Sequence, residues 1–242
     1  MSEPKLITAA KAHTEAEVAD LEPQADIMPH LLWLGRYGMG LLPMYMMNDD
    51  TKDSLAETMT ASLVVGRATE AVFVSDVWMA AYDRDDPAVD AAAGTAEIPP
   101  SQHPDRQELV MLMYHSRREV LMVSAPVTRY PDKAPTLGEW ETHPQSHPKF
   151  RTPSGRFGNA VNWGLHMAAE MPAEMAAMID AGWAAGQQQD LIEWFMKVQH
   201  SFIHPGAPPM RFEVEVERIN DEEPSPGQVI EGLFGTDPDQ AS

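Results

Sequence analysis

Two apolar runs separated by three polar residues constrain the fold of this chain more than any other feature. The runs are residues 109–115 and 119–128, with Ser-Arg-Arg between them. A short polar spacer between two strand-like runs predicts a β-hairpin. Residues 70–79 are rich in β-branched and aromatic side chains and predict a strand buried on both faces. Strict alternation over residues 211–217 predicts a further strand with one face toward water.

The clearest helix start lies upstream of these strands, where Ser54 is followed three positions later by Glu57. Such a pair can satisfy two free backbone donors reciprocally and is typical of a capping box. Apolar residues then recur at helical spacing, which predicts a helix over residues 54–67 that ends near Gly66.

A helical block over residues 151–204 separates the hairpin from the last strand. Pro172 suits a first helical position and Gly186 suits a left-handed helix end, so we expect a helix over residues 173–185. A second helix is expected over residues 187–203. The two helices would form an antiparallel pair packed against the sheet.

Together these elements predict an α+β fold, with an antiparallel sheet of about four strands packed against three or more helices. We expect a single domain over residues 29–219. Residues 1–26 and 221–242 carry six acidic residues each and little that could pack. Residues 1–28 and 220–242 are therefore expected to be flexible acidic tails.

The charge of the chain narrows the choice of partners. It has 37 acidic and 17 basic residues, for a formal net charge of -20. This charge opposes direct binding to nucleic-acid phosphates and to anionic lipid, and it favours a basic protein partner or cations. The absence of cysteine excludes disulfides, thiolate metal sites and cysteine nucleophiles, and it fits a reducing compartment.

No segment has the pattern of a membrane span or a secretory signal. The most apolar stretch, His30–Met47, is interrupted by Arg36 and Pro43, whereas a bilayer span needs about 20 nearly unbroken apolar residues. We expect this stretch to be buried in a protein core, with Gly38 and Gly40 allowing a close turn. The N-terminal segment lacks the apolar core of a secretory signal, so a cytoplasmic location is expected.

Part of the chain resembles a pattern in uncharacterised proteins of bacteria and their phages. The pattern consists of the capped helix, the run Glu70–Met79, the histidine-containing loop Pro100–Glu108 and the hairpin that follows. The resemblance covers roughly residues 54–128. It implies a shared fold unit and brings no activity, cofactor or catalytic residue with it.

The connection over residues 83–107 is long for a structureless loop, and such loops are often functional. It contains Ser101, His103 and Asp105, the residue types of a catalytic triad. A triad needs side chains that converge from separate elements, so a simple turn is the favoured interpretation here. The glycines of Gly35–Gly40 lack the strand and helix context of a phosphate-binding loop, and nucleotide binding is not expected.

Two clusters contain the residue types of a metal site. Glu193, His200 and His204 would project from one face near the end of the last helix. Lys197 shares this face and can pair with Glu193, so a solvated, ion-paired face is the competing interpretation.

The second cluster lies in a proline-containing loop without the spacing of a known metal signature, and comprises Glu139, Glu141, His143 and His147. Asp76 is the most unusual residue in the apolar run 70–79. Because a buried carboxylate must be paired or carry a raised pKa, we expect Asp76 to lie at a strand end, to pair with an arginine or backbone donors, or to be functional.

Charge is the one extreme property of the chain, which favours a non-enzymatic binding or accessory protein that associates with a basic protein partner. An acidic inhibitor of a nucleic-acid-binding protein is one concrete version of this hypothesis. The row Glu213, Glu215 and Glu217 would contribute to the interaction surface. The alternative is a metal-dependent enzyme that uses one of the His/Glu clusters and a divalent metal. No other cofactor is expected.

Overall fold

The computed structural model describes residues 3–44, 49–80, 89–90, 95–96, 100–144, 156–203 and 217–219. Its helices are α1 (Lys5–Asp20), α2 (Asp49–Val65), α3 (Arg156–Ala169), α4 (Ala173–Ala184), α5 (Gln188–Ile203) and one short 3-10 helix (Pro100–Gln102). The strands of the main sheet are β1 (His30–Gly35), β2 (Gly38–Pro43), β3 (Ala68–Met79), β6 (Gln107–Ser116), β7 (Val120–Thr128), β8 (Thr136–Leu137), β9 (Glu141–Pro144) and β10 (Glu217–Ile219). A separate pair consists of β4 (Val89–Asp90) and β5 (Thr95–Ala96).

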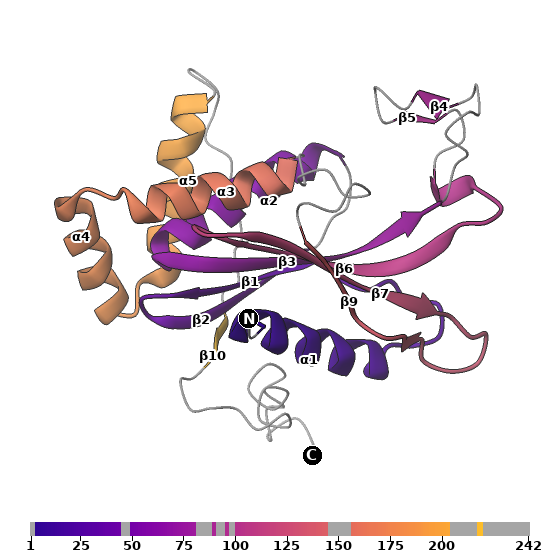
Figure 1. Cartoon of the computed structure of the whole chain (residues 1–242). Helices are drawn as coiled ribbons and strands as arrows, with labels where there is room; N and C mark the ends of the chain where they lie inside the picture. Colours follow the sequence, from indigo (N-terminus) through magenta and orange to yellow (C-terminus); the bar gives the residue numbers. More distant parts are fainter. Residues whose placement is uncertain are drawn as a thin grey trace, which may run out of the picture.

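One antiparallel sheet organises the described residues, in the order β10-β2-β1-β3-β6-β7-β8, and β9 also pairs with β7. The sheet is curled, with α2 and α3 over one face and α1 against the other (Figure 1). The predicted α+β class is confirmed. The predicted sheet of about four strands is too small, because β1, β2 and the short strands β8 and β9 also join it. No helix among the described residues is long and apolar enough to cross a membrane.

Each face of the sheet has its own hydrophobic core. On one face, Leu31, Trp33 and Phe73 pack with side chains of α2 and α3. On the other face, Leu32 and Val74 pack with side chains of α1. Because successive side chains of a strand point to opposite faces, β1 and β3 contribute to both cores at once.

The hairpin of β6 and β7 confirms the interpretation of the two apolar runs. His115 pairs with Val120 next to the turn. In the turn, Ser116 Oγ accepts hydrogen bonds from the backbone N–H groups of Arg118 and Glu119, at 3.2 and 3.1 Å. The polar spacer therefore reverses the chain with its own hydrogen bonds.

The neighbouring strand β3 confirms most of the run predicted over residues 70–79. Its central residues 71–75 are buried. Trp78 and Met79 are each 41% exposed, so the strand is not buried on both faces along its full length. The strand emerges from the core at this end.

The apolar stretch that begins at His30 forms the hairpin β1–β2, and burial in the core is confirmed for residues 30–33, 40–42 and 44, whereas residues 34–39 around the turn are half-buried or exposed. Gly38 at the turn has a φ of 102°, a conformation that favours glycine. A Cβ atom on Gly40 would lie 2.2 Å from the Trp33 ring. The close turn expected at these glycines is confirmed, although their strands were not predicted.

Helix α2 starts earlier than predicted. It begins at Asp49, and Ser54 lies inside it, where its carbonyl accepts a hydrogen bond from Thr58 Oγ1 at 2.8 Å. The capping-box prediction is therefore wrong, because the acidic residues upstream of Ser54 suit a first helical turn as well. The predicted end is confirmed, since the helix stops before Gly66 and Arg67 takes a positive φ of 48°.

Both helices predicted in the C-terminal block are confirmed, as α4 and α5. Pro172 stands at the N-cap of α4, and Gly186 follows the helix with a left-handed φ of 76°. Helix α5 packs on α2, where Thr58 Oγ1 lies 3.6 Å from Met196 Sδ. The expected packing directly against the sheet is therefore wrong, because α2 and α3 already cover that face.

Only the end of the strand predicted over residues 211–217 is described. Glu217 begins β10 and pairs with Leu41 of β2. β10 thus belongs to the same sheet as the β6–β7 hairpin, at the other edge. Residues 211–216 and the tail predicted over residues 220–242 lie outside the described residues.

The prediction of a flexible tail over residues 1–28 is wrong. Residues 5–20 form α1, in which Leu6 and Ile7 are fully buried and Val18 is 2% exposed. Trp140 Nε1 also donates a hydrogen bond to Glu15 Oε1 of this helix, at 2.7 Å. The acidic residues of α1 do not prevent packing, because the helix needs only one apolar face.

We expect Leu6→Ala to lower the free energy of unfolding by about 3 kcal/mol, because it leaves a cavity in the core between α1 and the sheet. The exposed Thr8→Ala on the same helix should change it by less than about 0.5 kcal/mol. Denaturant unfolding of both variants gives the comparison. Equal, near-zero effects would show that α1 does not pack on the sheet.

Candidate functional site

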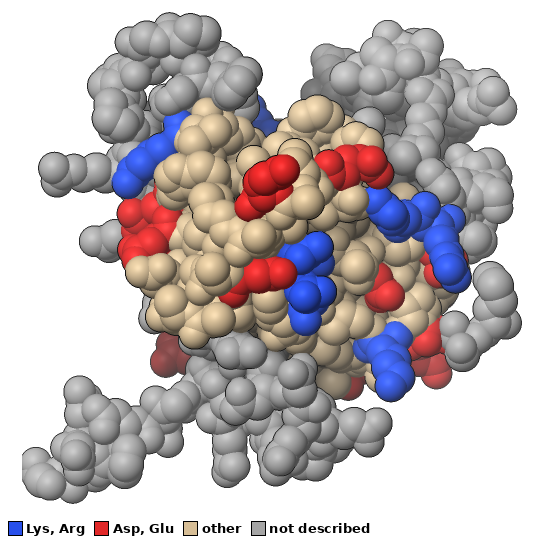
Figure 2. Space-filling view, turned by 90° about the vertical axis from the view of Figure 1, so that its left-hand side faces the viewer, with Lys and Arg blue, Asp and Glu red and all other residues tan. Residues whose placement is uncertain are grey.

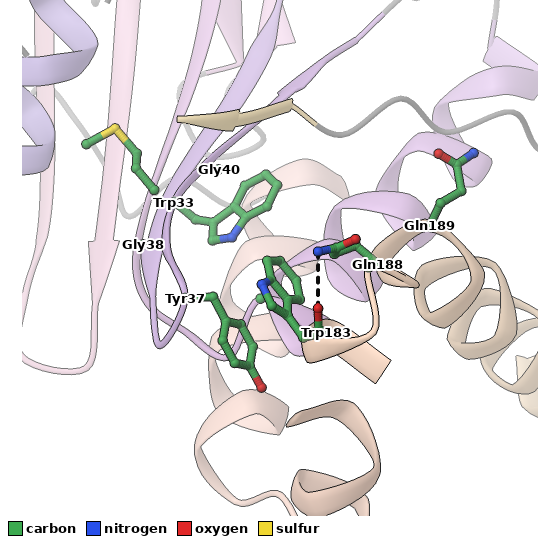
Figure 3. Close-up of a pocket in the computed structure, with 10 residues that line it drawn as sticks. Trp33, Tyr37, Gly38, Gly40, Trp183, Gln188 and Gln189 are labelled. Carbon is green, nitrogen blue, oxygen red and sulfur yellow. Dashed lines mark hydrogen bonds between the residues drawn. The ribbon is translucent and has the colours of Figure 1, made fainter. Parts of the chain in front are cut away.

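A cavity of about 240 Å³ lies between the β1–β2 hairpin and the junction of α4 and α5 (Figure 3). Aromatic rings, four glycines and two neutral amides make up most of its wall. The aromatic residues are Trp33, Tyr37 and Trp183, and the amides are Gln188 and Gln189. Among the described residues, no charged side chain lines the cavity.

Trp33 reaches this wall because the residues around its ring are glycines. A Cβ atom on Gly40 would lie 2.2 Å from the ring, and one on Gly66 would lie 2.3 Å from its Nε1 atom. Trp33 is only 2% exposed, so its indole has little freedom to turn. The sequence thus provides a rigid aromatic surface where β1, β2 and the end of α2 meet.

Asp180 of α4 holds the opposite wall in place. It accepts hydrogen bonds from the Tyr37 hydroxyl and from Arg67 Nη1, the latter at 3.0 Å. Arg36 Nε lies 3.3 Å from the same carboxylate. Tyr37 in turn stacks on Trp183, with ring centroids 4.3 Å apart. One carboxylate therefore links α4 to the hairpin turn and to Arg67, which follows the end of α2.

The pKa values of Asp180 and Tyr37 are shifted in opposite directions. The hydrogen bond from Tyr37 lowers the pKa of Asp180, and the two arginines act in the same direction. Burial, followed by the hydrogen bond to Asp180, raises the pKa of Tyr37 to about 12. Asp180 therefore stays charged and Tyr37 stays protonated at neutral pH.

The end of α4 places the two amides at the cavity. The N–H of Gly186 donates to Trp183 O at 3.0 Å, and the next N–H donates to Gly182 O at 2.9 Å, which is the Schellman pattern. α5 begins directly afterwards with Gln188, whose Nε2 lies 3.4 Å from Trp183 O (Figure 3). Trp183 Nε1 is buried and has no hydrogen-bond partner among the described residues.

The residues of the suspected triad form a turn. His103 N–H donates to Pro100 O, and the N–H of Asp105 donates to His103 Nδ1 at 3.1 Å. Ser101 is exposed in the 3-10 helix. These residues use their polar groups locally, which supports the turn interpretation.

The two clusters singled out as metal sites are only partly described. Glu193 pairs with Lys197 at 3.7 Å, as the competing interpretation expects. The side chains of His200 and His204 lie outside the described residues. The Glu193, His200 and His204 site therefore stays a prediction.

The loop cluster is also incompletely described. Glu139 and Glu141 are exposed, and His143 Nε2 lies 2.9 Å from Ser124 Oγ of β7. His147 lies outside the described residues. His143 Nε2 lies 4.0 Å from Glu141 Oε2, but the three described members do not all bring their ligand atoms together.

Asp76 is half-buried and lies near Glu108 and Arg129. Burial, followed by the negative charge of Glu108, raises its pKa, while Arg129 opposes the shift. Arg129 itself binds Glu108, with Nη2 to Oε1 at 2.6 Å. Because Arg129 binds Glu108, the expected pairing of Asp76 with an arginine or with backbone donors stays a prediction.

A cluster that was not predicted lies on the α1 face of the sheet. His13 and Glu17 are four residues apart on α1, and His30 begins β1. Each of the three side chains offers one ligand atom, and these atoms lie within 4.8 Å of one another. The spacing of His13 and Glu17 was the available signal, but it has meaning only once residues 5–20 are known to be helical.

Burial sets the protonation states of this cluster. It raises the pKa of Glu17 to about 7, against the effect of the Met28 N–H that donates to this carboxylate. It lowers the pKa of His30 to about 3 and also lowers that of His13. Both imidazoles are therefore neutral at pH 7.

Comparison with known proteins finds no matching family model, curated protein or solved structure. The resemblance over residues 54–128 therefore stays a prediction.

We expect Glu17→Gln to raise the free energy of unfolding of the metal-free protein at pH 8 by about 2 kcal/mol, because the wild type must keep a buried carboxylate charged there. The folded-state pKa of about 7 lies above the ordinary value of 4.5 for a glutamate, so the wild type regains this stability as the pH falls through that range. Denaturant unfolding in EDTA at pH 8 and pH 5 measures the difference. If Glu17→Gln raised the free energy of unfolding by the same amount at both pH values, the raised pKa of Glu17 would be contradicted.

Proposed function

We propose that the protein binds a small, neutral, heteroaromatic molecule in the cavity between the β1–β2 hairpin and the α4–α5 junction. The observation that supports this most strongly is the combination of rigid indole walls with the amides of Gln188 and Gln189. A well-formed cavity with a few converging polar groups is the usual form of a small-molecule site.

The walls favour a flat ligand. Aromatic rings attract other planar rings in offset or edge-to-face arrangements. Trp183 is already stacked on one side by Tyr37, so its polar edge and other side are what a ligand could meet. Trp33 and Trp183 approach the cavity from the hairpin and from α4 (Figure 3).

The polar groups favour a ligand with both donors and acceptors. A glutamine amide both donates and accepts, and the unpaired Trp183 Nε1 can only donate. A heterocycle with adjacent donor and acceptor atoms, such as a nucleobase, complements this set. Because a water molecule takes up about 30 Å³ of liquid, a cavity of about 240 Å³ suits one ring or two fused rings.

The charge of the protein limits the ligand further. The formal net charge of -20 opposes a polynucleotide, so a free base or a similar neutral heterocycle is the better candidate. Described charged side chains near the cavity already pair with one another, as Asp180 does with Arg36 and Arg67.

We expect a panel of neutral heterocycles, including the nucleobases, to contain ligands that quench tryptophan fluorescence in a saturable way. Gln188→Met should weaken their binding about tenfold, because it removes a hydrogen-bonding amide without changing the size of the side chain much. Gln187→Met is the matched control, since Gln187 is exposed and does not line the cavity.

Two outcomes would contradict the proposal. One is the absence of saturable quenching by any member of the panel. The other is binding that Gln188→Met and Gln187→Met leave equally unchanged, because the ligand would then lie elsewhere. Preference for a peptide carrying an exposed aromatic side chain would instead make the cavity a protein-docking site.

Association with a basic protein is a second, separate proposal, supported by the net charge of -20. Figure 2 shows one face of the molecule, on which acidic and basic side chains are interspersed rather than segregated. The acidic surface is therefore better sought on the row Glu213, Glu215 and Glu217, of which only the backbone of Glu217 is described.

Neutralising this row, with Glu213→Gln, Glu215→Gln and Glu217→Gln together, should slow association with a basic partner at low salt. Electrostatic steering raises association rates by about 10 to 1000-fold and is screened by salt. Capture from a lysate at low and high salt, followed by rate measurements on the captured protein, tests this. The proposal for this row would be contradicted if the triple variant captured the partner as the wild type does, at the same rate and without dependence on salt.

A further inference from the structure

The cluster of His13, Glu17 and His30 contains buried polar atoms that the protein itself does not satisfy. Glu17 Oε2 and His30 Nε2 are buried and have no hydrogen-bond partner among the described residues. His30 is 3% exposed, and His13 is 8% exposed. Because buried polar atoms are nearly always paired, the unpaired atoms indicate a missing partner.

The backbone of Met28 orients two of the three side chains. Its N–H donates to Glu17 Oε1 at 3.1 Å, and its carbonyl oxygen lies 3.0 Å from His30 Nδ1. If Nδ1 carries the proton that this carbonyl accepts, Nε2 keeps its lone pair. Ligands of protein metal sites are typically oriented in this way, by a carbonyl behind the histidine and a hydrogen bond to the carboxylate.

The geometry of the cluster is compact enough for one ion. One ligand atom from each side chain lies within 4.8 Å of the others, and the rings of His13 and His30 meet edge to face at 4.7 Å between centroids. His30 Nδ1 lies 3.6 Å from Glu17 Oε2, too far for a direct hydrogen bond. The three groups converge without bonding to one another.

We propose that His13, Glu17 and His30 bind one divalent transition-metal ion, of the class of Zn²⁺, Fe²⁺ or Co²⁺. Two imidazoles and one carboxylate suit these ions, whereas Ca²⁺ and Mg²⁺ require mainly oxygen ligands. Three protein ligands leave at least one coordination position for water or another small ligand.

Binding requires little change in the protonation of the histidines. Burial lowers the pKa of both imidazoles, so no proton has to leave them at pH 7. Glu17 would give up a proton more readily beside a dication than beside a neutral histidine. The competing explanation for the unpaired atoms is a metal-free cluster in which Glu17 is protonated. Metal titration distinguishes this state from a metal site.

The proposed ion would connect two elements of the fold. His13 and Glu17 belong to α1, and His30 belongs to β1 at the centre of the sheet. Metal binding would therefore fasten α1 to the sheet and stabilise the folded state in proportion to the logarithm of the free metal concentration. This site is separate from the cavity proposed to bind a heteroaromatic ligand. The metal site lies on the α1 face of the sheet, and the cavity lies between the β1–β2 hairpin and the α4–α5 junction.

The experiment uses full-length protein without a histidine tag, stripped with EDTA and titrated with Zn²⁺ against a chromophoric chelator. The same protein is titrated with Co²⁺ and followed by its visible absorption. We expect one ion per chain, a Co²⁺ spectrum that indicates nitrogen and oxygen ligands, and a melting temperature that rises with metal. Glu17→Gln and His13→Gln should each weaken binding at least 100-fold.

Two matched controls isolate the site. Glu22→Gln changes an exposed glutamate close to the cluster in sequence, and His166→Gln changes an exposed histidine of α3. Both should bind metal as the wild type does. Circular dichroism of the metal-free variants checks that Glu17→Gln and His13→Gln fold.

Either of two results would overturn the proposal. Wild-type protein that binds Zn²⁺, Co²⁺, Fe²⁺ and Mn²⁺ no better than Glu17→Gln does would assign the cluster to a protonated carboxylic acid. Stoichiometric binding that survives both Glu17→Gln and His13→Gln would place the metal elsewhere, with the Glu193, His200 and His204 set as the next candidate.

Discussion

The alternation of side chains along β1 is the constraint on which both candidate sites depend. β1 lies between β2 and β3, and its register places Leu32 opposite Val72 and Trp33 opposite Ala71. Trp33 therefore faces the core under α2 and α3, while His30 and Leu32 face α1. A slip of one residue would move every one of these side chains to the wrong face, so burial on both sides fixes the register strongly. One strand thus supplies an aromatic wall to the cavity and an imidazole to the histidine cluster.

The rest of the fold supports these two placements from opposite sides. On one side, the absence of side chains at Gly40 and Gly66 admits the Trp33 ring, and Asp180 fastens α4 to the hairpin turn. On the other side, α1 covers the sheet and brings His13 next to His30. The cavity needs rigid walls to discriminate among flat ligands, and the cluster needs α1 to dock before its ligand atoms converge. Both sites therefore depend on tertiary packing rather than on a local motif.

Local patterns predicted the local parts of the structure. The β6–β7 hairpin, the core of β3 and the helices α4 and α5 follow from apolar periodicity and from turn residues such as Gly186. The hairpin β1–β2 and helix α1 were not predicted, for physical reasons. Arg36 and three glycines interrupt the apolar stretch, although Arg36 lies in the turn between the strands and the glycines belong to β1 and β2 themselves. The buried face of α1 includes His13, Thr14 and the half-buried Glu17, so the helical period is visible only if polar residues are counted as buried. Neither site could be predicted, because each joins residues that only the sheet brings together.

The most direct test of this account is a set of NMR distance restraints on the side chains of β1, measured in one sample of the full-length protein. The account predicts contacts from the Trp33 indole to the Hα atoms of Gly40 and Gly66, and contacts from the His30 imidazole to the ring of His13. Contacts from Trp33 to α1, or from His30 to α2, would show that the side chains of β1 point to the opposite faces of the sheet. They would contradict both sites at once.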